Sequence, residues 1–209
     1  TNGRGVYENI KNVIGFLLSG NMAGIFCVLY ASLMALPAPF AAVHLLFINL
    51  LTDSLPAIAI GMEPASSDLL GRKPRDPKEP LLSGDLVKRI GLQGLLIAVP
   101  VMTAFYLGYQ TGTAEAMTMA FATLTLARLF HGFNCREDRS ILRMGLSGNP
   151  ASLAAFGMGV LLLLAVLLIP ALHGLFLVAD LTLAQLGMIL GLAVLPTLCI
   201  QITRIARGK

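Results

Sequence analysis

Apolar residues along the chain are gathered into six long stretches, and short polar or proline-containing segments separate them. Each stretch is close to the ~20 residues that a helix needs to cross a hydrocarbon layer ~30 Å thick. The six predicted helices cover residues 13–36, 40–62, 86–109, 116–133, 151–172 and 183–202. The pattern therefore predicts an all-α protein, an integral membrane bundle of six transmembrane helices, with residues 1–209 as a single transmembrane domain.

The Lys and Arg residues are expected on one side of these helices. Of the 15 Lys and Arg, all but Arg128 precede the first stretch, follow the last, or lie in or beside the loops 63–85 and 134–150. The loops on the opposite side contain no Lys or Arg. Because cytoplasmic loops of membrane proteins carry the excess of basic residues, we expect both termini and both long loops in the cytosol. The sequence shows no secretory signal or organelle address, so a bacterial-type plasma membrane is the expected location.

The composition agrees with this picture and excludes several classes of protein. Hydrophobic residues make up 56% of the chain and charged residues only 12%, against ~25% charged in soluble domains, which excludes an ordinary soluble domain and a disordered chain. The three cysteines are far apart and indicate neither a disulfide framework nor a zinc site. We find no phosphate-binding loop, nucleotide fingerprint, catalytic triad or internal repeat. No catalytic or cofactor-binding residue is therefore assigned, and no nucleic-acid partner is expected.

Polar residues inside the second stretch suggest a cation site. Asn49, Thr52 and Asp53 stand at positions i, i+3 and i+4, so a helix would place them on one face. A carboxylate at the centre of a membrane helix costs about 2.5–3.5 kcal/mol on insertion scales, and a bound cation would offset that cost. Ca²⁺ takes about six to eight oxygen ligands, so other helices must supply more. The alternative is that Asp53 pairs with Arg128 and that the hydroxyl groups bond to their own helix.

Three further residues bear on this site. Pro56 lacks an N–H and so frees the carbonyl of Thr52, which would lie beside Asp53. Asn21, in the first stretch, would either supply an amide oxygen to the site or make an interhelical hydrogen bond. Arg128, in the fourth stretch, would either reach the interface as an anchor or act as an internal countercharge near Asp53.

Several segments resemble calcium-type P-type ATPases. The segment NLLTDSLPA at 49–57 closely resembles the sixth transmembrane helix of these pumps, and sodium–potassium and proton pumps read differently there. The other similar segments are GRGVYENIK at 3–11 (the stalk into helix five), GMEP at 61–64 and RKPR at 72–75 (the loop between helices six and seven), and MTMA at 117–120 (the start of helix eight). The resemblance covers the whole chain and implies helices five to ten, with residues 1–36 as stalk and first span.

Carried over residue by residue, the resemblance implies a cation site at Asn21, Asn49, Thr52 and Asp53. Two positions depart from the two-site calcium pumps: Gly24 stands where they have a helix-five glutamate, and Arg128 where they have a helix-eight glutamate. Both changes remove carboxylates from the same one of the two sites. We therefore expect one transported ion per cycle, with Arg128 as a countercharge in place of a second ion.

The resemblance also implies an activity and the partners that it needs. The chain would be the membrane, cation-binding portion of an ATP-driven exporter of Ca²⁺ or Mn²⁺, a P-type Ca²⁺-transporting ATPase. The phosphorylated Asp-Lys-Thr-Gly-Thr segment, the nucleotide domain, the actuator domain and the helix-four Pro-Glu-Gly segment are absent from the sequence. ATP and Mg²⁺ would bind in those cytosolic domains, and the chain alone would not hydrolyse ATP. Its expected partners are the rest of the same pump, including helices one to four, and the lipid bilayer.

Two other functions fit the polar residues without the resemblance. In the first, the bundle is a passive cation channel or a secondary carrier in which Asp53 handles protons or Na⁺. In the second, it is a non-transporting membrane scaffold in which Asp53 and Arg128 form a structural ion pair.

Overall fold

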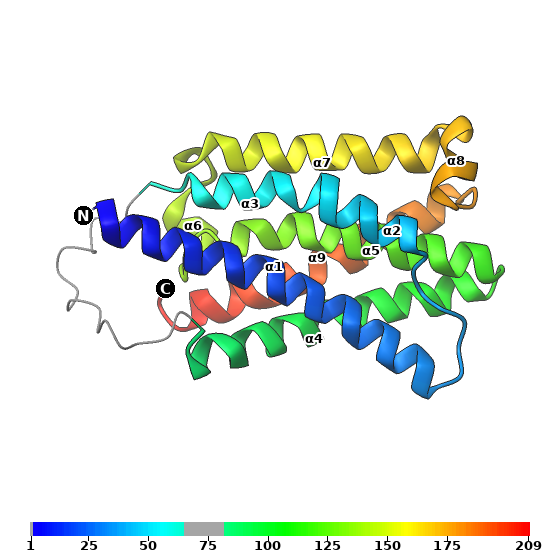
Figure 1. Cartoon of the computed structure of the whole chain (residues 1–209), viewed down its shortest axis with the longest axis horizontal. Coiled ribbons are helices and arrows are strands. Elements are labelled where there is room, and N and C mark those ends of the chain that lie inside the picture. The colour runs from blue at the N-terminus through cyan, green and yellow to red at the C-terminus, as the bar shows by residue number, and fades with distance from the viewer. Residues whose placement is uncertain (1, 65–81) are drawn as a thin grey trace.

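The computed structural model describes residues 2–64 and 82–209, which form helices with no strand among them. The long helices run back and forth along one axis, and both ends of the chain lie at the same end of the molecule as α6 (Figure 1). In chain order the helices are α1 (Asn2–Leu33), α2 (Ala42–Phe47), the π-helical turn η1 (Ile48–Thr52), α3 (Ser54–Gly61), α4 (Gly84–Tyr109), α5 (Thr113–Asn134), α6 (Ile141–Met144), the 3₁₀ turn η3 (Leu146–Gly148), α7 (Pro150–Leu168), α8 (Pro170–Phe176) and α9 (Leu183–Ala206). The predicted all-helical fold is confirmed.

Among the described residues, five helical segments are long and apolar enough to cross a membrane. They are Gly3–Leu33, Ala42–Gly61, Gly84–Tyr109, Pro150–Leu168 and Leu183–Ala206. A segment of this length and composition is typical of a transmembrane helix, so the chain is an integral membrane protein.

The segment predicted as the fourth span, α5, is not among these five, although it contains 22 residues. Most of its side chains are buried, because α4, α9, α7, α1 and α3 all pack against it. Its polar residues, which include three buried threonines and Arg128, lower its mean hydropathy. A helix that is surrounded by protein does not have to be as apolar as one that faces lipid, and α5 is therefore the central helix of the bundle.

The second predicted span is not a continuous α-helix. It consists of α2, the π-helical turn η1 and α3, and the Asp53 N–H donates to the Ile48 carbonyl at 2.7 Å, five residues back. Pro56 lies in the first turn of α3, where its missing N–H removes the bond to the Thr52 carbonyl. The irregular turn thus lies immediately before Asp53 rather than at the proline.

Several helix bounds differ from the expected spans for local reasons. Helix α1 begins at Asn2, so the expected stalk and first span form one uninterrupted helix. The fifth span is divided into α7 and α8, because Pro170 begins a new helix at its first position. The loop 134–150 contains α6 and η3. Most of the loop 63–85 lies outside the described residues.

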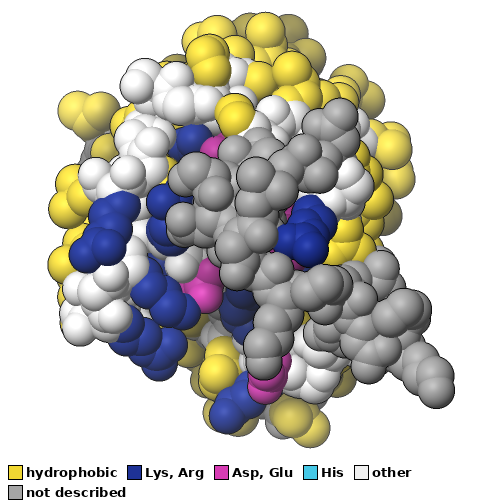
Figure 2. Space-filling view, turned by 90° about the vertical axis from the view of Figure 1, so that its left-hand side faces the viewer, with side chains coloured by type: hydrophobic (Ala, Val, Ile, Leu, Met, Phe, Trp, Pro, Cys, Tyr) yellow, Lys and Arg dark blue, Asp and Glu magenta, His cyan; other side chains and the backbone are white. Residues whose placement is uncertain are grey.

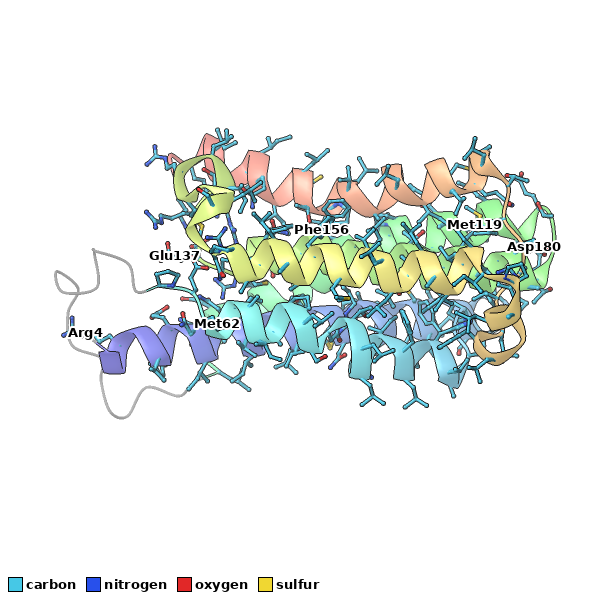
Figure 3. All side chains as sticks on the ribbon, turned by 90° about the horizontal axis from the view of Figure 1, so that it is seen from above. Arg4, Met62, Met119, Glu137, Phe156 and Asp180 are labelled. Carbon is cyan, nitrogen blue, oxygen red and sulfur yellow. The ribbon has the colours of Figure 1, made fainter. Side chains whose placement is uncertain are left out.

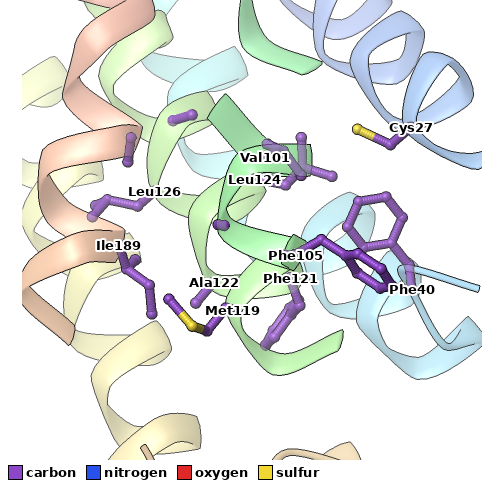
Figure 4. Close-up of a cluster of buried hydrophobic side chains, with 14 of the residues drawn as sticks. Cys27, Phe40, Val101, Phe105, Met119, Phe121, Ala122, Leu124, Leu126 and Ile189 are labelled. Atoms are coloured by element: carbon purple, nitrogen blue, oxygen red, sulfur yellow. The ribbon is translucent and has the colours of Figure 1, made fainter. Parts of the chain in front are cut away.

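A cluster of buried apolar side chains holds α1, α4, α5 and α9 together. Val101 of α4 lies beside Leu124 of α5, Phe105 of α4 lies beside Phe121 of α5, and Met119 of α5 lies near Ile189 of α9 (Figure 4). Burial of apolar surface contributes about 25 cal/mol per Å² to stability when that surface would otherwise be exposed to water.

Small residues allow the closest helix crossings. A Cβ at Gly94 of α4 would lie 2.8 Å from the Met22 Cβ of α1, and one at Gly108 would lie 2.6 Å from the Glu115 carbonyl oxygen of α5. Either contact is shorter than real Cβ atoms make, so the absence of a side chain at both positions lets α4 approach its two neighbours.

The outer surface separates apolar from charged side chains. Large apolar residues within the long helices, such as Leu92, Leu161 and Leu190, are exposed. Lys and Arg side chains gather at the end of the molecule that carries both chain ends (Figure 2). Arg4, Met62 and Glu137 lie toward this end, whereas Asp180 lies at the opposite end (Figure 3). Exposed apolar surface on this scale is suited to lipid or to further protein.

Candidate functional site

The predicted site residues Asp53 and Arg128 form an ion pair inside the bundle. Asp53 immediately precedes α3 and Arg128 lies in α5, and each residue is 3% exposed. The Arg128 Nη2 group donates to Asp53 Oδ2 and also to Asn21 Oδ1 of α1, at 3.2 Å in the second case. The guanidinium group therefore connects the first, second and fourth predicted spans at one point.

Gly20 makes room for this guanidinium group against α1. A Cβ at residue 20 would lie 2.6 Å from Arg128 Cζ and 2.7 Å from Arg128 Nη2. Any side chain at residue 20 would force Arg128 to move. Gly24, one turn further along α1, has no heavy atom within 4 Å of an added Cβ. The arginine thus packs against Gly20 and leaves open the space beside Gly24.

Each member of the ion pair keeps one buried polar atom without a partner. Asp53 Oδ1 and Arg128 Nε make no hydrogen bond within the described part of the chain. An unpaired buried carboxylate oxygen costs free energy and is uncommon in folded proteins. Asp53 therefore has one oxygen that is free to coordinate a cation while the other is held by Arg128.

Asn49 and Thr52 lie in the π-helical turn η1, and their surroundings differ. The Thr52 side chain is buried, and its Oγ1 donates to the Ile48 carbonyl of the same helix at 3.1 Å. The Asn49 side chain is exposed, and its amide group makes no hydrogen bond with side chains or backbone of the described residues. The expectation that these two residues and Asp53 share one face assumed 3.6 residues per turn, and a π-helical turn has more residues per turn. Asn49 is exposed while Thr52 and Asp53 are buried, and the larger offset introduced by the π-helical turn separates Asn49 from Thr52 rather than from Asp53.

Asn21 is exposed like Asn49, although its amide oxygen contacts Arg128. Within residues 2–64 and 82–209, no group of three or more His, Cys, Asp or Glu side chains is arranged to hold a metal ion. Asp53 is thus the only carboxylate of the described site. Its other oxygen ligands would have to be neutral groups of this chain or groups of a further protein segment.

A second buried polar group, which the sequence analysis did not single out, lies one helical turn beyond Arg128. His131 is 1% exposed, and its Nε2 lies 2.9 Å from Ser19 Oγ of α1. Its Nδ1 lies 3.0 Å from Asn134 Nδ2, and Asn134 in turn bonds to Thr197 and Gln201 of α9. Since the Ser19 hydroxyl donates to the Gly15 carbonyl at 2.6 Å, a proton on His131 Nε2 satisfies all of these contacts. These bonds connect α1, α5 and α9, and no short-range sequence pattern indicates them.

A larger buried cluster lies at the basic end of the bundle, and we call it the Glu63 cluster. It consists of Glu63, Arg136, Asn149, Asn9 and Asn12. Arg136 is 1% exposed and binds Glu63 through two hydrogen bonds, at 2.8 and 3.0 Å. The Asn149 amide donates to Glu63 Oε2 at 2.7 Å and to the Ala59 carbonyl at 2.8 Å.

The Glu63 cluster also includes the first helix. The Asn9 amide of α1 donates to the Glu63 carbonyl at 2.9 Å, and the Asn12 amide donates to the Arg136 carbonyl at 3.0 Å. The cluster therefore joins α1, the end of α3, the segment after α5 and the start of α7. Two of the residues that it joins are more than 70 positions apart in the sequence.

Comparison of the sequence with known proteins places the chain in a family. The family described as "Cation transporting ATPase, C-terminus" matches residues 37–206. A calcium-transporting ATPase of Bacillus subtilis is 36% identical over 99% of the chain, and a calcium-transporting ATPase 1 of Lactococcus lactis is also 36% identical over 99%. The calcium-transporting ATPase type 2C member 1 of Mus musculus is 29% identical over 91%.

The chain spans about a quarter of the length of these relatives: 24% of the two bacterial proteins and 21% of the mouse protein. The matched family covers most of the chain, including Asp53, Arg128 and the helices that carry them. The chain therefore belongs to the cation-transporting ATPase family, as part of the C-terminal membrane region of calcium-type P-type pumps.

Proposed function

We propose that the chain is the membrane, cation-binding portion of an ATP-driven exporter of a divalent cation, Ca²⁺ or Mn²⁺. The observation that carries this proposal is the free oxygen of a buried carboxylate, Asp53 Oδ1, beside the fixed positive charge of Arg128. The relatives named as calcium-transporting ATPases support Ca²⁺ as the transported ion. ATP and Mg²⁺ would be used in cytosolic domains that the relatives' greater length can accommodate.

The ion site is proposed at Asp53, Asn49, Thr52 and Asn21. Together these side chains offer carboxylate, amide and hydroxyl oxygens, which are the ligands of hard cations. Asn21 and Asn49 are exposed inside segments that are apolar enough to cross a membrane. A polar side chain at that depth is costly in lipid, so their exposure favours a further protein segment on this side of α1 and η1. Helices one to four of the same pump would supply it.

Arg128 is proposed as a built-in countercharge that limits the site to one ion. Its guanidinium group occupies the space between Gly20 and Asp53, and a second cation there would be repelled. The open space beside Gly24 lacks the carboxylate that a second site would need. One ion transported per ATP hydrolysed is the stoichiometry that follows.

All six predicted spans, including α5, are proposed to cross the membrane with both chain ends in the cytosol. The two ends and the basic side chains lie at one end of the bundle, which supports this orientation (Figures 1 and 2).

The long α1 helix would carry a movement of the cytosolic domains into the membrane, because it is uninterrupted from Asn2 to Leu33. Its contact with Arg128 through Asn21 would pass that movement to the ion site.

The test is uptake of radiolabelled Ca²⁺ into inverted membrane vesicles that contain the full-length pump, with and without ATP. We expect ATP-driven uptake, with about one Ca²⁺ moved per ATP, and loss of more than ~90% of it in Asp53→Asn because the site loses its carboxylate. Asp180→Asn is the matched control, since the Asp180 side chain is 91% exposed at the opposite end of the bundle. Uptake of Ca²⁺ in the presence of Mn²⁺ as a competitor shows which of the two ions the site prefers.

Other outcomes would contradict the proposal in different ways. Uptake that does not require ATP would favour the passive channel or secondary carrier. A folded wild-type pump without uptake of either metal would favour the scaffold, in which Asp53 and Arg128 are only a structural pair. A ratio of two Ca²⁺ per ATP would contradict the single site while leaving the pump assignment intact.

A further inference from the structure

A groove of about 560 Å³ lies between α4 and α9 at the basic end of the bundle, and the ion site does not use it. It contains side chains from the first half of α4, the last half of α9 and the segment after α5. The lining residues divide into two groups along the helices, and this division indicates what the groove binds.

The part of the groove nearest the end of the molecule is basic. Lys88 and Arg89 of α4 and Arg204, Arg207 and Lys209 near the end of α9 line it, against the two carboxylates of Asp85 and Asp138. Asp138 is already engaged, because it pairs with Arg204 at 3.4 Å and with Lys209 at 2.7 Å.

Three of the basic side chains have no acidic partner. Lys88, Arg89 and Arg207 make no ion pair with a carboxylate in the described part of the chain. The Lys88 and Arg207 side chains are exposed, and Arg89 is half-buried. They leave an excess of positive charge at the mouth of the groove, which favours an anion.

The deeper part of the groove is mostly apolar. Leu92 and Leu96 follow Lys88 and Arg89 at helical spacing on α4, and Ile200 precedes Arg204 and Arg207 at helical spacing on α9. Both helices therefore change from basic to apolar in the same direction, from the end of the bundle toward its middle. Leu92 is 58% exposed, so this part of the groove is accessible from the side of the bundle that faces lipid.

We propose that this groove binds an anionic phospholipid of the leaflet at the basic end of the bundle. The phosphate would lie among Lys88, Arg89 and Arg207, and an acyl chain would follow Leu92, Leu96 and Ile200. A free phosphate or a nucleotide would use the basic mouth but leave the apolar part without a partner. Basic pockets between membrane helices at a cytosolic surface bind lipid head groups in this way.

The test is photocrosslinking in the full-length pump reconstituted into nanodiscs. The probe is phosphatidylglycerol with a diazirine near the middle of one acyl chain, and phosphatidylcholine with the same diazirine is the comparison. We expect phosphatidylglycerol to label the peptides that contain Leu92–Leu96 and Cys199–Thr203, as read by peptide mass spectrometry, and phosphatidylcholine to label them much less.

The variants replace basic side chains by uncharged glutamine and leave the apolar residues of the groove unchanged. A triple variant with Lys88→Gln, Arg89→Gln and Arg207→Gln should weaken labelling at subsaturating probe about a hundredfold, since each basic residue contributes about 1 kcal/mol to anionic lipid binding and every 1.4 kcal/mol is a factor of about ten. The control triple variant, with Lys11→Gln, Arg139→Gln and Arg143→Gln, removes the same charge at the same end of the bundle outside the groove and should keep the labelling. Thermal unfolding of both variants checks that they fold.

Four outcomes would overturn the proposal. The first is equal labelling by the two lipids. The second is an equal loss of labelling in the two triple variants, which would show only a general charge effect. The third is complete displacement of the phosphatidylglycerol probe by glycerol 3-phosphate at equal concentration, which would identify a site for a free anion. The fourth is absence of labelling in the folded wild type, which would show that no lipid acyl chain lies in the groove.

Discussion

At the scale of single residues, the absence of a side chain at Gly20 decides where the positive charge of Arg128 lies. The guanidinium group packs directly on the α1 backbone at Gly20, from where it donates to both Asn21 and Asp53. The fixed position of this charge is the basis for proposing a single ion, and it can be tested without removing any charged group.

We predict that Gly20→Ala displaces Arg128 and thereby damages the ion site. The added Cβ would overlap the guanidinium group, and overpacking of this kind costs about 1–3 kcal/mol. Weaker stimulation of ATP hydrolysis by Ca²⁺ and a lower temperature of thermal unfolding are the expected results in the full-length pump.

Gly15→Ala is the control on the same helix. There the added Cβ would meet Leu86 and Arg89 side-chain atoms at 3.7 and 3.8 Å, which are ordinary contacts. Calcium stimulation in Gly20→Ala that matches Gly15→Ala and the wild type would contradict the assigned position of Arg128.

The sequence predicted part of this residue-scale picture. It identified Asp53 as a charge inside a membrane segment, and it left open whether Arg128 reaches the interface or lies near Asp53 as a countercharge. It did not predict the exposure of Asn49, the π-helical turn that contains this residue, or the buried position of His131. These features depend on contacts between residues far apart in the chain, and no local pattern reports them.

At the scale of helices, the Glu63 cluster fastens the basic end of the bundle. It binds the first turns of α7 and the end of α3 to the part of α1 that precedes the apolar stretch. Since α3 begins beside Asp53, the cluster holds one end of the short helix whose other end borders the ion site.

We predict that Glu63→Gln lowers the stability of the pump far more than a substitution that breaks an exposed ion pair. The change removes the charge that compensates Arg136, which would remain buried, and breaking such a pair costs about 3–5 kcal/mol. Thermal unfolding of the purified full-length pump measures the effect, and we expect a decrease of several degrees.

The comparison variant is Arg139→Gln, which breaks the Arg139–Glu137 pair. The Arg139 side chain is 42% exposed, and an exposed pair contributes about 0–1 kcal/mol. If the two variants unfolded at the same temperature, the Glu63 cluster would have no special role in stability.

Helix positions were more predictable than helix shapes. Apolar periodicity located the long helices because burial and lipid contact both require apolar side chains over about 20 residues. It could not predict the π-helical turn, since a turn with one extra residue leaves no mark in the apolar pattern of 40–62, or the break between α7 and α8. The apolar pattern also did not predict that α1 begins at Asn2, because the first turns of this helix are polar.

At the scale of the whole molecule, the proposed orientation predicts which surfaces are accessible from each side of the membrane. Arg143→Cys, in α6, should react with a membrane-impermeant maleimide in inverted vesicles, because the basic end would face outward there. Asp180→Cys, between α8 and α9, should react in intact cells. Peptide mass spectrometry separates these two positions from the native cysteines.

The same experiment tests whether α5 crosses the membrane. If α5 stayed on one side, the helices after it would be inverted, and Arg143→Cys would react in intact cells while Asp180→Cys reacted in inverted vesicles. The unmodified chain, whose Cys27 is buried, serves as the background control.

The central position of α5 also has a consequence for how the protein is made. A translocon sorts each emerging segment by its hydropathy, and Arg128 in the last third of α5 adds to the cost of insertion, which reaches about 2.5–3.5 kcal/mol for an arginine at a helix centre. In the proposed topology α5 therefore enters together with α4, to which it is joined by only residues 110–112. Asp53 is synthesised earlier and is already in the membrane when Arg128 arrives. The ion pair is thus available as an assembly contact during synthesis, before α9 is made and closes over the other side of α5.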